Sequence, residues 1–263
     1  MSFSYTYLIN QDHIDFSKLA VGEENEILTY FIDSEVEAKY LDRYYASSVG
    51  FVNNTNAIQI TSIGNFLNNH EFIRDIFIRL DEIIDLDFVE MTHNNGSILD
   101  IYPISFASNF QENTVGMCIK QEVQAGKWFD VLWLAKSQSN LNSFDKNTII
   151  HEIGHSIGLS HPNDDGFDER WSSEDTVMSY NKGGNDWNFW FSDEDLNALK
   201  KIWGRENDTG TMVFNKNFEK YKFFQSSDKK YSIETSIGKE SITGIKNLKF
   251  PNKLVDVEED IEG

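Results

Sequence analysis

The segment HEIGHSIGLSH, residues 151–161, constrains the fold of this chain more than any other stretch of the sequence. His151 and His155 are four residues apart, so on a helix they lie one above the other on the same face. Gly158 comes where such a helix must end, because glycine readily adopts the positive φ that turns the chain back. His161 can then approach the same face, and the segment predicts three converging imidazoles.

Three imidazoles can occupy three corners of a tetrahedral metal site, and a fourth corner left for water is typical of a catalytic zinc. Glu152 follows the first histidine and is placed to take a proton from that water as a general base. The alternative is a set of ordinary surface or core histidines. Five specified positions agree with this motif by chance about once in ten thousand chains of this size, so we favour the zinc site.

Hydrophobic periodicity places this segment in an α+β fold, with helices packed on a single sheet. The patterns predict strands at residues 27–32, 87–91, 98–104, 115–121 and 129–135 and helices at residues 65–84, 145–159 and 192–203. Ser143 or Asp145 is the expected N-cap of the second helix. The third begins with the capping box of Ser192 and Asp195 and ends at Gly204. Residues 33–61 have no pattern that we can assign.

Composition excludes several classes of function. The chain has 263 residues, with 23 Lys or Arg against 43 Asp or Glu, which gives a net charge of −20. A surface this acidic repels phosphates and anionic lipids, so we expect neither a nucleic acid nor a membrane as a partner. The single cysteine, Cys118, excludes an intramolecular disulfide and a Cys-rich metal cluster. The N-terminus has no signal-peptide pattern, and no run of about 18 apolar residues predicts a transmembrane helix.

The histidine segment resembles the HExxHxxGxxH signature of the metzincin metallopeptidases. Residues 176–180, TVMSY, look like the Met-turn that these enzymes place beneath the metal. The context is most similar to the serralysin branch: His161-Pro162, an acidic loop with a glycine, Met-Ser-Tyr, and a last helix that ends in Ile-Trp-Gly.

This resemblance implies a metzincin-type catalytic domain, with a twisted five-stranded mixed sheet, a backing helix, an active-site helix and a C-terminal helix. It implies a zinc-dependent endopeptidase, in which a zinc-bound water activated by Glu152 attacks the peptide bond. Tyr180 would ligate the resting zinc and then stabilise the oxyanion. The residues that fall on the family's functional positions are the zinc ligands His151, His155 and His161, the base Glu152, the Met-turn residue Met178, Tyr180 and the helix-exit glycine Gly158.

The same resemblance implies that a peptide or protein substrate binds along an edge strand at residues 115–121, where main-chain hydrogen bonds can extend the sheet. We expect residues 26–204 to form the catalytic domain, after an N-terminal lead-in segment (1–25) and before a small β-rich C-terminal appendage (205–263). We also expect a monomeric bacterial protein that works outside the cell, exported by a route that reads a C-terminal signal.

Several smaller features have alternative explanations. Calcium is not supported by a motif, because the GGxGxDxxx repeats of serralysins are absent and the acidic loop 164–169 lacks alternating oxygen ligands. His13, His70 and His93 lack metal-type spacing, so we expect them at the surface, and Cys118 is expected to pack within its strand. In the aromatic cluster Trp187, Phe189, Trp190 and Phe191, at least two residues would pack in the core beneath the last helix, and one would line the substrate pocket.

Two alternatives to a general endopeptidase stay open. One is a latent or non-catalytic metzincin scaffold that acts as a binding or adhesion protein, and the other is a dedicated processing protease. Asp12 or Asp15 in the lead-in segment would make the enzyme latent if its carboxylate reached the zinc.

Overall fold

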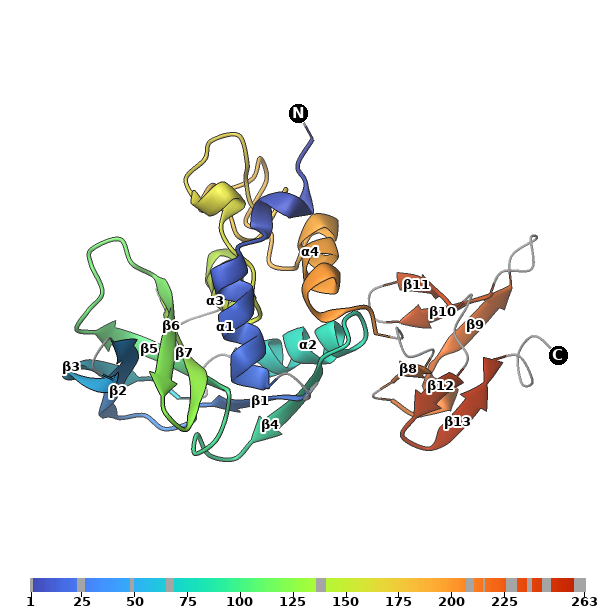
Figure 1. Cartoon of the computed structure of the whole chain (residues 1–263). Helices are drawn as coiled ribbons and strands as arrows, with labels where there is room; N and C mark the ends of the chain where they lie inside the picture. Colours follow the sequence, from blue (N-terminus) through green and yellow to red (C-terminus); the bar gives the residue numbers. More distant parts are fainter. Residues whose placement is uncertain are drawn as a thin grey trace.

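The computed structural model of the chain describes residues 2–22, 27–47, 50–64, 69–135, 141–206, 211–214, 216–225, 231–235, 238–242 and 247–257 (Figure 1). The fold is mixed α+β, as predicted, with a large mixed sheet and a few helices packed against it. No helix in these ranges is long and apolar enough to cross a membrane.

The five predicted strands are confirmed, and they lie side by side in one sheet. In spatial order they are β4 (Asp87–Met91), β1 (Ile27–Ile32), β5 (Leu99–Ala107), β7 (Gly126–Leu134) and β6 (Gly116–Val123). The first four run parallel, and β6 is antiparallel to β7. Within the described residues β6 pairs with β7 alone, so it forms an edge of the sheet.

The sheet has seven strands among the described residues, not five. The two additional strands, β2 (Ala38–Ser47) and β3 (Gly50–Ser62), form a hairpin from the stretch that we could not assign. β3 pairs antiparallel with the second half of β5, beyond the point where β1 ends. Among the hairpin side chains that the structure describes, the buried apolar ones are Leu41, Ile58 and Ile60, which are too few to produce a regular pattern.

Alternation along the strands gives the sheet two different buried faces. One face packs against the helices through Leu99, Ile101, Phe129, Val131 and Trp133. The opposite face packs against the β2–β3 hairpin through Tyr102, Ile104, Ile119 and Leu132. A side-chain period of two along each strand separates these two cores.

The helices lie on one face of the sheet (Figure 1). They are α1 (Gln11–Val21), α2 (Asn69–Asp81), α3 (Ser143–Ser156) and α4 (Asp193–Trp203). The predicted helix at 65–84 is shorter than expected, and its residues 65–68 fall outside the described ranges. The N-cap of α3 is Asn142, not Ser143 or Asp145, because the Asn142 side chain accepts the Asp145 N–H. The capping box of α4 and its end at Gly204, with a φ of 93°, are confirmed.

The N-terminal residues hold more regular structure than the lead-in segment that we expected. They form a 3₁₀ turn, η1 (Tyr5–Leu8), and the helix α1, which Asn10 caps. The pattern was hard to recognise because the buried positions of α1 are only Ile14, Val21 and the polar Ser17. Two buried apolar residues, seven positions apart, do not define an amphipathic helix.

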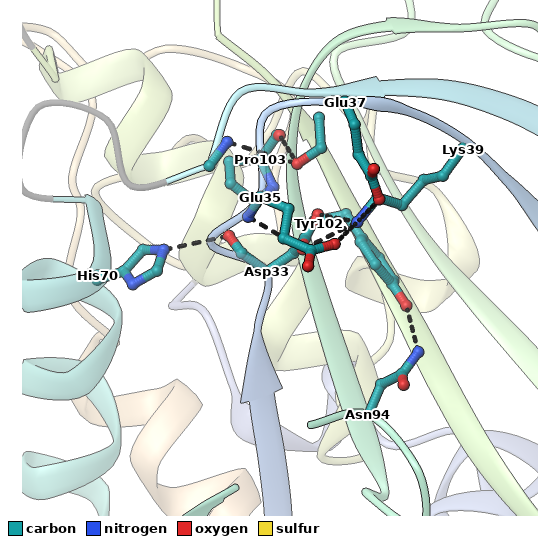
Figure 2. Close-up of polar contacts among 10 residues, drawn as sticks. Asp33, Glu35, Glu37, Lys39, His70, Asn94, Tyr102 and Pro103 are labelled. Atoms are coloured by element: carbon teal, nitrogen blue, oxygen red, sulfur yellow. Dashed lines mark hydrogen bonds and ion pairs between the residues drawn. The ribbon is translucent and has the colours of Figure 1, made fainter. Parts of the chain in front are cut away.

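A polar cluster fixes the turn between β1 and β2 (Figure 2). Asp33 is 1% exposed, and its carboxylate pairs with the Lys39 ammonium at 3.0 Å. Lys39 also contacts Glu35 and Glu37 at 3.2 Å each. His70 of α2 lies against the Asp33 carbonyl oxygen, with its Nε2 3.2 Å away, and is 4% exposed. The prediction of a surface position for His70 is therefore wrong, since this backbone contact allows the imidazole to be buried.

The residues after Gly204 form two small sheets with a core of their own. One sheet has the order β11 (Gly238–Ser241), β10 (Tyr231–Thr235), β9 (Lys222–Gln225), and the other has β13 (Lys253–Asp256), β12 (Asn247–Phe250), β8 (Thr211–Val213). Their core consists of Phe214, Tyr221, Ile233, Ile242, Leu248, Phe250, Val255 and Val257. The β-rich character expected here is present, and the domain boundary at 204–205 stays a prediction.

Candidate metal centre

Helix α3 presents His151 and His155 on one face and ends one residue after His155. Gly158 then adopts a φ of 102°, a left-handed conformation that a side chain would strain. The chain reverses there and returns with His161 beside the helix. Gly158 thus has the predicted conformation at the predicted place.

The three imidazoles meet through their Nε2 atoms. Nε2 of His161 lies 3.2 Å from Nε2 of His151 and 3.2 Å from Nε2 of His155. Three nitrogens around a tetrahedral zinc with bonds of about 2.05 Å are separated by about 3.3 Å. The separation of these atoms therefore fits a shared metal ion of that size.

Backbone carbonyls fix the protonation of two of these rings. Nδ1 of His151 lies 2.8 Å from the Val177 oxygen, and Nδ1 of His155 lies 2.9 Å from the Leu159 oxygen. Because a carbonyl oxygen only accepts, each Nδ1 carries the hydrogen and each Nε2 of these neutral rings has a free lone pair. The Nε2 lone pairs of His151 and His155 are thus available at 3.2 Å from Nε2 of His161, where a cation could accept both.

The surroundings of the triad lower the proton affinity of all three rings. Burial, and then the charge of a neighbouring imidazole, lowers the pKa of His151 to about 3 and that of His161 to about 4. The same two causes hold the pKa of His155 well below its usual value. Neutral imidazole is the form that binds a metal ion, so these ligands do not need to lose a proton at neutral pH.

Glu152 lies on α3 next to this group, with 7% of its surface exposed. Burial raises the pKa of its carboxyl group to about 8, and a hydrogen bond from the Cys118 N–H opposes that shift. Gly116, the first residue of β6, lies directly against this carboxylate. A Cβ on Gly116 would be 2.5 Å from Oε1 of Glu152, so only glycine leaves room for the acid here.

Tyr180 covers the triad from the solvent side. Its ring stacks on His151 with centroids 5.1 Å apart and lies 4.7 Å from the ring of His161. Burial, and then the charge of Glu152, raises the pKa of the phenol to about 12, so it is a donor at neutral pH. Gly166 makes this position possible, because a Cβ there would lie 2.6 Å from the Tyr180 ring.

Met178 lies beneath α3 and is fully buried. Its sulfur would be 2.8 Å from a Cβ on Gly154, so the glycine between the two helical histidines allows close packing. Helix α4 holds this turn through Asp195, which accepts the Val177 N–H at 3.0 Å and the Thr176 hydroxyl. Val177 is also the residue whose carbonyl orients His151. The capping box of α4 therefore also supports the metal centre, a role that the capping motif alone did not reveal.

Two cavities reach this centre, and both are lined by Glu152 and Tyr180. The first, of about 720 Å³, which we call the aromatic cavity, has Phe144, Phe167 and Trp187 in its lining beside several polar side chains. The second, of about 510 Å³, is polar, and its lining includes His13, Lys120, Ser160 and Asp164. Among the aromatic residues of the cluster 187–191, Trp187 lines the first cavity, whereas Phe191 belongs to the core.

The remaining predicted residues have mixed outcomes. His93 is exposed, as expected, and Cys118 packs against the main core. His13 is not an ordinary surface residue, since its ring lies 5.9 Å from that of His155. The carboxylates of Asp12 and Asp15 are on exposed residues of α1 and are not among the groups that converge with the triad.

The acidic loop after His161 is used for hydrogen bonding. Asp164 accepts hydrogen bonds from Ser160 and Asn10, and Asp168 pairs with Arg170. These contacts give the loop a structural explanation that does not involve calcium.

Comparison with known proteins gives a partial match. Serralysin G of Dickeya chrysanthemi is 33% identical to this chain over 100 residues, which cover 32% of the chain and 21% of that protein. The match thus spans about a fifth of the length of this curated relative. No family model matches the chain. Part of this chain is therefore similar to part of a serralysin.

Proposed function

We propose that this chain is a zinc-dependent endopeptidase related to the serralysins, with His151, His155 and His161 as the metal ligands. The observation that carries the proposal is the convergence of three Nε2 atoms, that of His161 lying 3.2 Å from each of the other two, with two lone pairs fixed by backbone carbonyls, beside a buried carboxyl group. Three imidazoles favour zinc among the common divalent ions. When bound, the ion supplies Lewis acidity that polarises the scissile carbonyl and lowers the pKa of nearby water.

The residues of this chain supply the proton transfers. A bound divalent cation would favour the carboxylate form of Glu152. That carboxylate accepts a proton from the attacking water as the new C–O bond forms, and it returns the proton to the amine when the C–N bond breaks. Tyr180 donates its phenolic hydrogen to the oxyanion that develops on the former carbonyl. A donor aimed at developing charge in a shielded site contributes several kcal/mol, on the order of 3.

The edge strand β6 supports an extended peptide as the substrate. Antiparallel pairing, the more stable arrangement per residue, would run the peptide from the Lys120 end of β6 toward Gly116. The residue after the scissile bond would then face the aromatic cavity, and the residues before it would face the polar cavity. We therefore propose a preference for a large apolar side chain directly after the cleaved bond. A monomeric state, secretion and Tyr180 as a resting ligand stay predictions of the resemblance.

The test is hydrolysis of a mixed fluorogenic peptide library by the zinc-loaded protein and by the variant Glu152→Gln. Glutamine keeps the size of the side chain and cannot take a proton, so we expect the rate to fall by about 1,000-fold. Zinc content and the midpoint of thermal unfolding are measured on both proteins as controls.

Three outcomes are informative. Activity that is lost with a chelator and in the variant, while the variant still binds one zinc, supports the proposal. Bound zinc without cleavage of any peptide contradicts it and favours the scaffold alternative. Cleavage that survives in Glu152→Gln contradicts the assignment of the base.

A further inference from the structure

The residues Ser4–Asn10, which we call the N-terminal strap, lie along the link between the second and third histidines. Ile9 forms an antiparallel bridge with Leu159, and the Ser160 N–H donates to the Leu8 oxygen at 3.0 Å. Leu8 itself is fully buried in the main core. The strap is therefore a paired part of the fold at the point where the chain leaves α3.

The strap pairs with Leu159, whose backbone oxygen contacts the His155 ring. The Leu159 oxygen accepts the hydrogen of Nδ1 of His155 at 2.9 Å, and the same residue pairs with Ile9. The partner of Nδ1 sets the ring plane and hence the direction of the Nε2 lone pair. Ile9 is therefore bridged to the same residue whose carbonyl oxygen orients the His155 ring.

The strap also holds the turn that follows His161. Oδ1 of Asp164 accepts a hydrogen bond from the Ser160 hydroxyl at 2.7 Å and from Nδ2 of Asn10 at 2.9 Å. Asn163 and Asp164 have φ values of 51° and 63°, and a left-handed conformation at such residues persists only where contacts enforce it. Asn10 supplies one of those contacts to Asp164, which is three residues after His161.

A further contact anchors the strap away from the triad. The Tyr5 N–H donates to Oε2 of Glu194 on α4 at 2.6 Å. The helix that follows the strap packs against the reversal after α3, where Cα of Ile14 lies 3.7 Å from a Cβ position on Gly158. Asp12 and Asp15 of this helix are exposed. The contacts of the strap are therefore those of a support for the ligand loop, not those of an inhibitory segment with a carboxylate on the metal.

We propose that the N-terminal strap is a positioning element of the metal centre, which holds residues 159–164 so that His155 and His161 aim at the same point. The proposal rests on the proposed zinc site. It predicts that the strap raises zinc affinity, and it does not require any particular substrate.

Asn10 allows the test because its side chain has two separable contacts. Oδ1 caps α1 by accepting the N–H groups of Asp12 and His13, and Nδ2 donates to Asp164. Asn10→Ser keeps a capping oxygen without reaching Asp164, and Asn10→Asp keeps the cap but places a carboxylate opposite Asp164. Gln11→Glu is the matched control, because Gln11 bonds to Asp15 on the exposed side of α1 and gains the same charge.

The measurement is the zinc dissociation constant by competition with a chromophoric chelator, together with thermal unfolding of each metal-free protein. We expect the Kd to rise about 10-fold in Asn10→Asp and about 3-fold in Asn10→Ser, and to stay within 2-fold in Gln11→Glu. An added carboxylate near a cation site would by itself lower the Kd. A higher Kd for Asn10→Asp would therefore show an effect on the position of the histidines and not an effect of charge.

Two results would overturn the inference. One is an unchanged Kd in both Asn10 variants with normal unfolding of the metal-free proteins. The other is an equal change in Gln11→Glu, which would indicate a general effect of charge. A protein that binds zinc with the expected order of affinities and cleaves no peptide would contradict the proposed function and leave this inference in place.

Discussion

Both faces of the large sheet bury polar groups, but the hydrogen bonding of these groups differs between the two faces. On the face that packs against the β2–β3 hairpin, the buried acids have donors. These contacts are Lys39 with Asp33, Ser97 with Asp100, and Gln121 with Asp130. On the helix face, the three Nε2 atoms of the triad face one another, and two of them are fixed as acceptors. Polar groups that satisfy each other stabilise a fold, whereas imidazole nitrogens that converge with their lone pairs available are suited to a cation.

The first prediction concerns the hydroxyl of Tyr180 on the helix face. Tyr180→Phe keeps the ring that stacks on His151 and removes only the hydroxyl. Since the hydroxyl is needed only when the oxyanion develops, we expect kcat to fall about 100-fold with little change in KM. Steady-state kinetics on one library-derived peptide provide the measurement. Because Tyr180 is 41% exposed, unfolding should be unchanged, and a clear loss of stability would contradict the assignment.

The second prediction concerns the aromatic cavity. Trp187 lines it and packs edge-on against Phe144, with ring centroids 5.2 Å apart. We expect Trp187→Ala to lower kcat/KM about 10-fold for peptides with a large apolar residue after the cleaved bond, and to spare those with alanine there. Phe189→Ala is the control, because Phe189 is exposed and is not part of the cavity lining. Equal losses for both kinds of peptide would show that Trp187 supports the fold instead of selecting the substrate.

The third prediction tests the opposite face. Burial, together with the charges of Asp130 and Asp33, raises the pKa of Asp100 to about 8, although Ser97 opposes the shift. A carboxyl group whose pKa is higher in the folded protein stabilises the fold at low pH, and that contribution is lost as the pH rises from about 4 to 8. Asp100→Asn cannot ionise, so its free energy of unfolding relative to the wild type should increase by about 3–4 kcal/mol between pH 5 and pH 8.

Urea unfolding at the two pH values measures this difference, with Asp87→Asn, an exposed acid of β4, as the control for charge. The peptidase activity of Asp100→Asn should equal that of the wild type at each pH. A loss of activity would mean that the two faces are coupled, and the contrast between them would not hold.

Sequence patterns located the triad because its spacing is local: one helical turn, then a glycine reversal. The same holds for the five strands around it, whose apolar residues recur regularly. Helix α1 was missed because it buries too few apolar side chains to produce a period, and the described side chains of the hairpin include only three buried apolar ones. The close contacts at Gly116, Gly154 and Gly166 were missed for another reason, since each depends on a residue brought near only by the fold.

The strap also has a consequence for the order of events during synthesis. Tyr5 leaves the ribosome early, but its partner Glu194 lies 189 residues later in the chain. At about 5–20 residues per second, roughly 10–40 s separate the two. During that interval the histidines emerge while the contact between the strap and α4 is still missing. A polypeptide released before α4 would therefore carry all three imidazoles and lack the contact that ties the strap to α4.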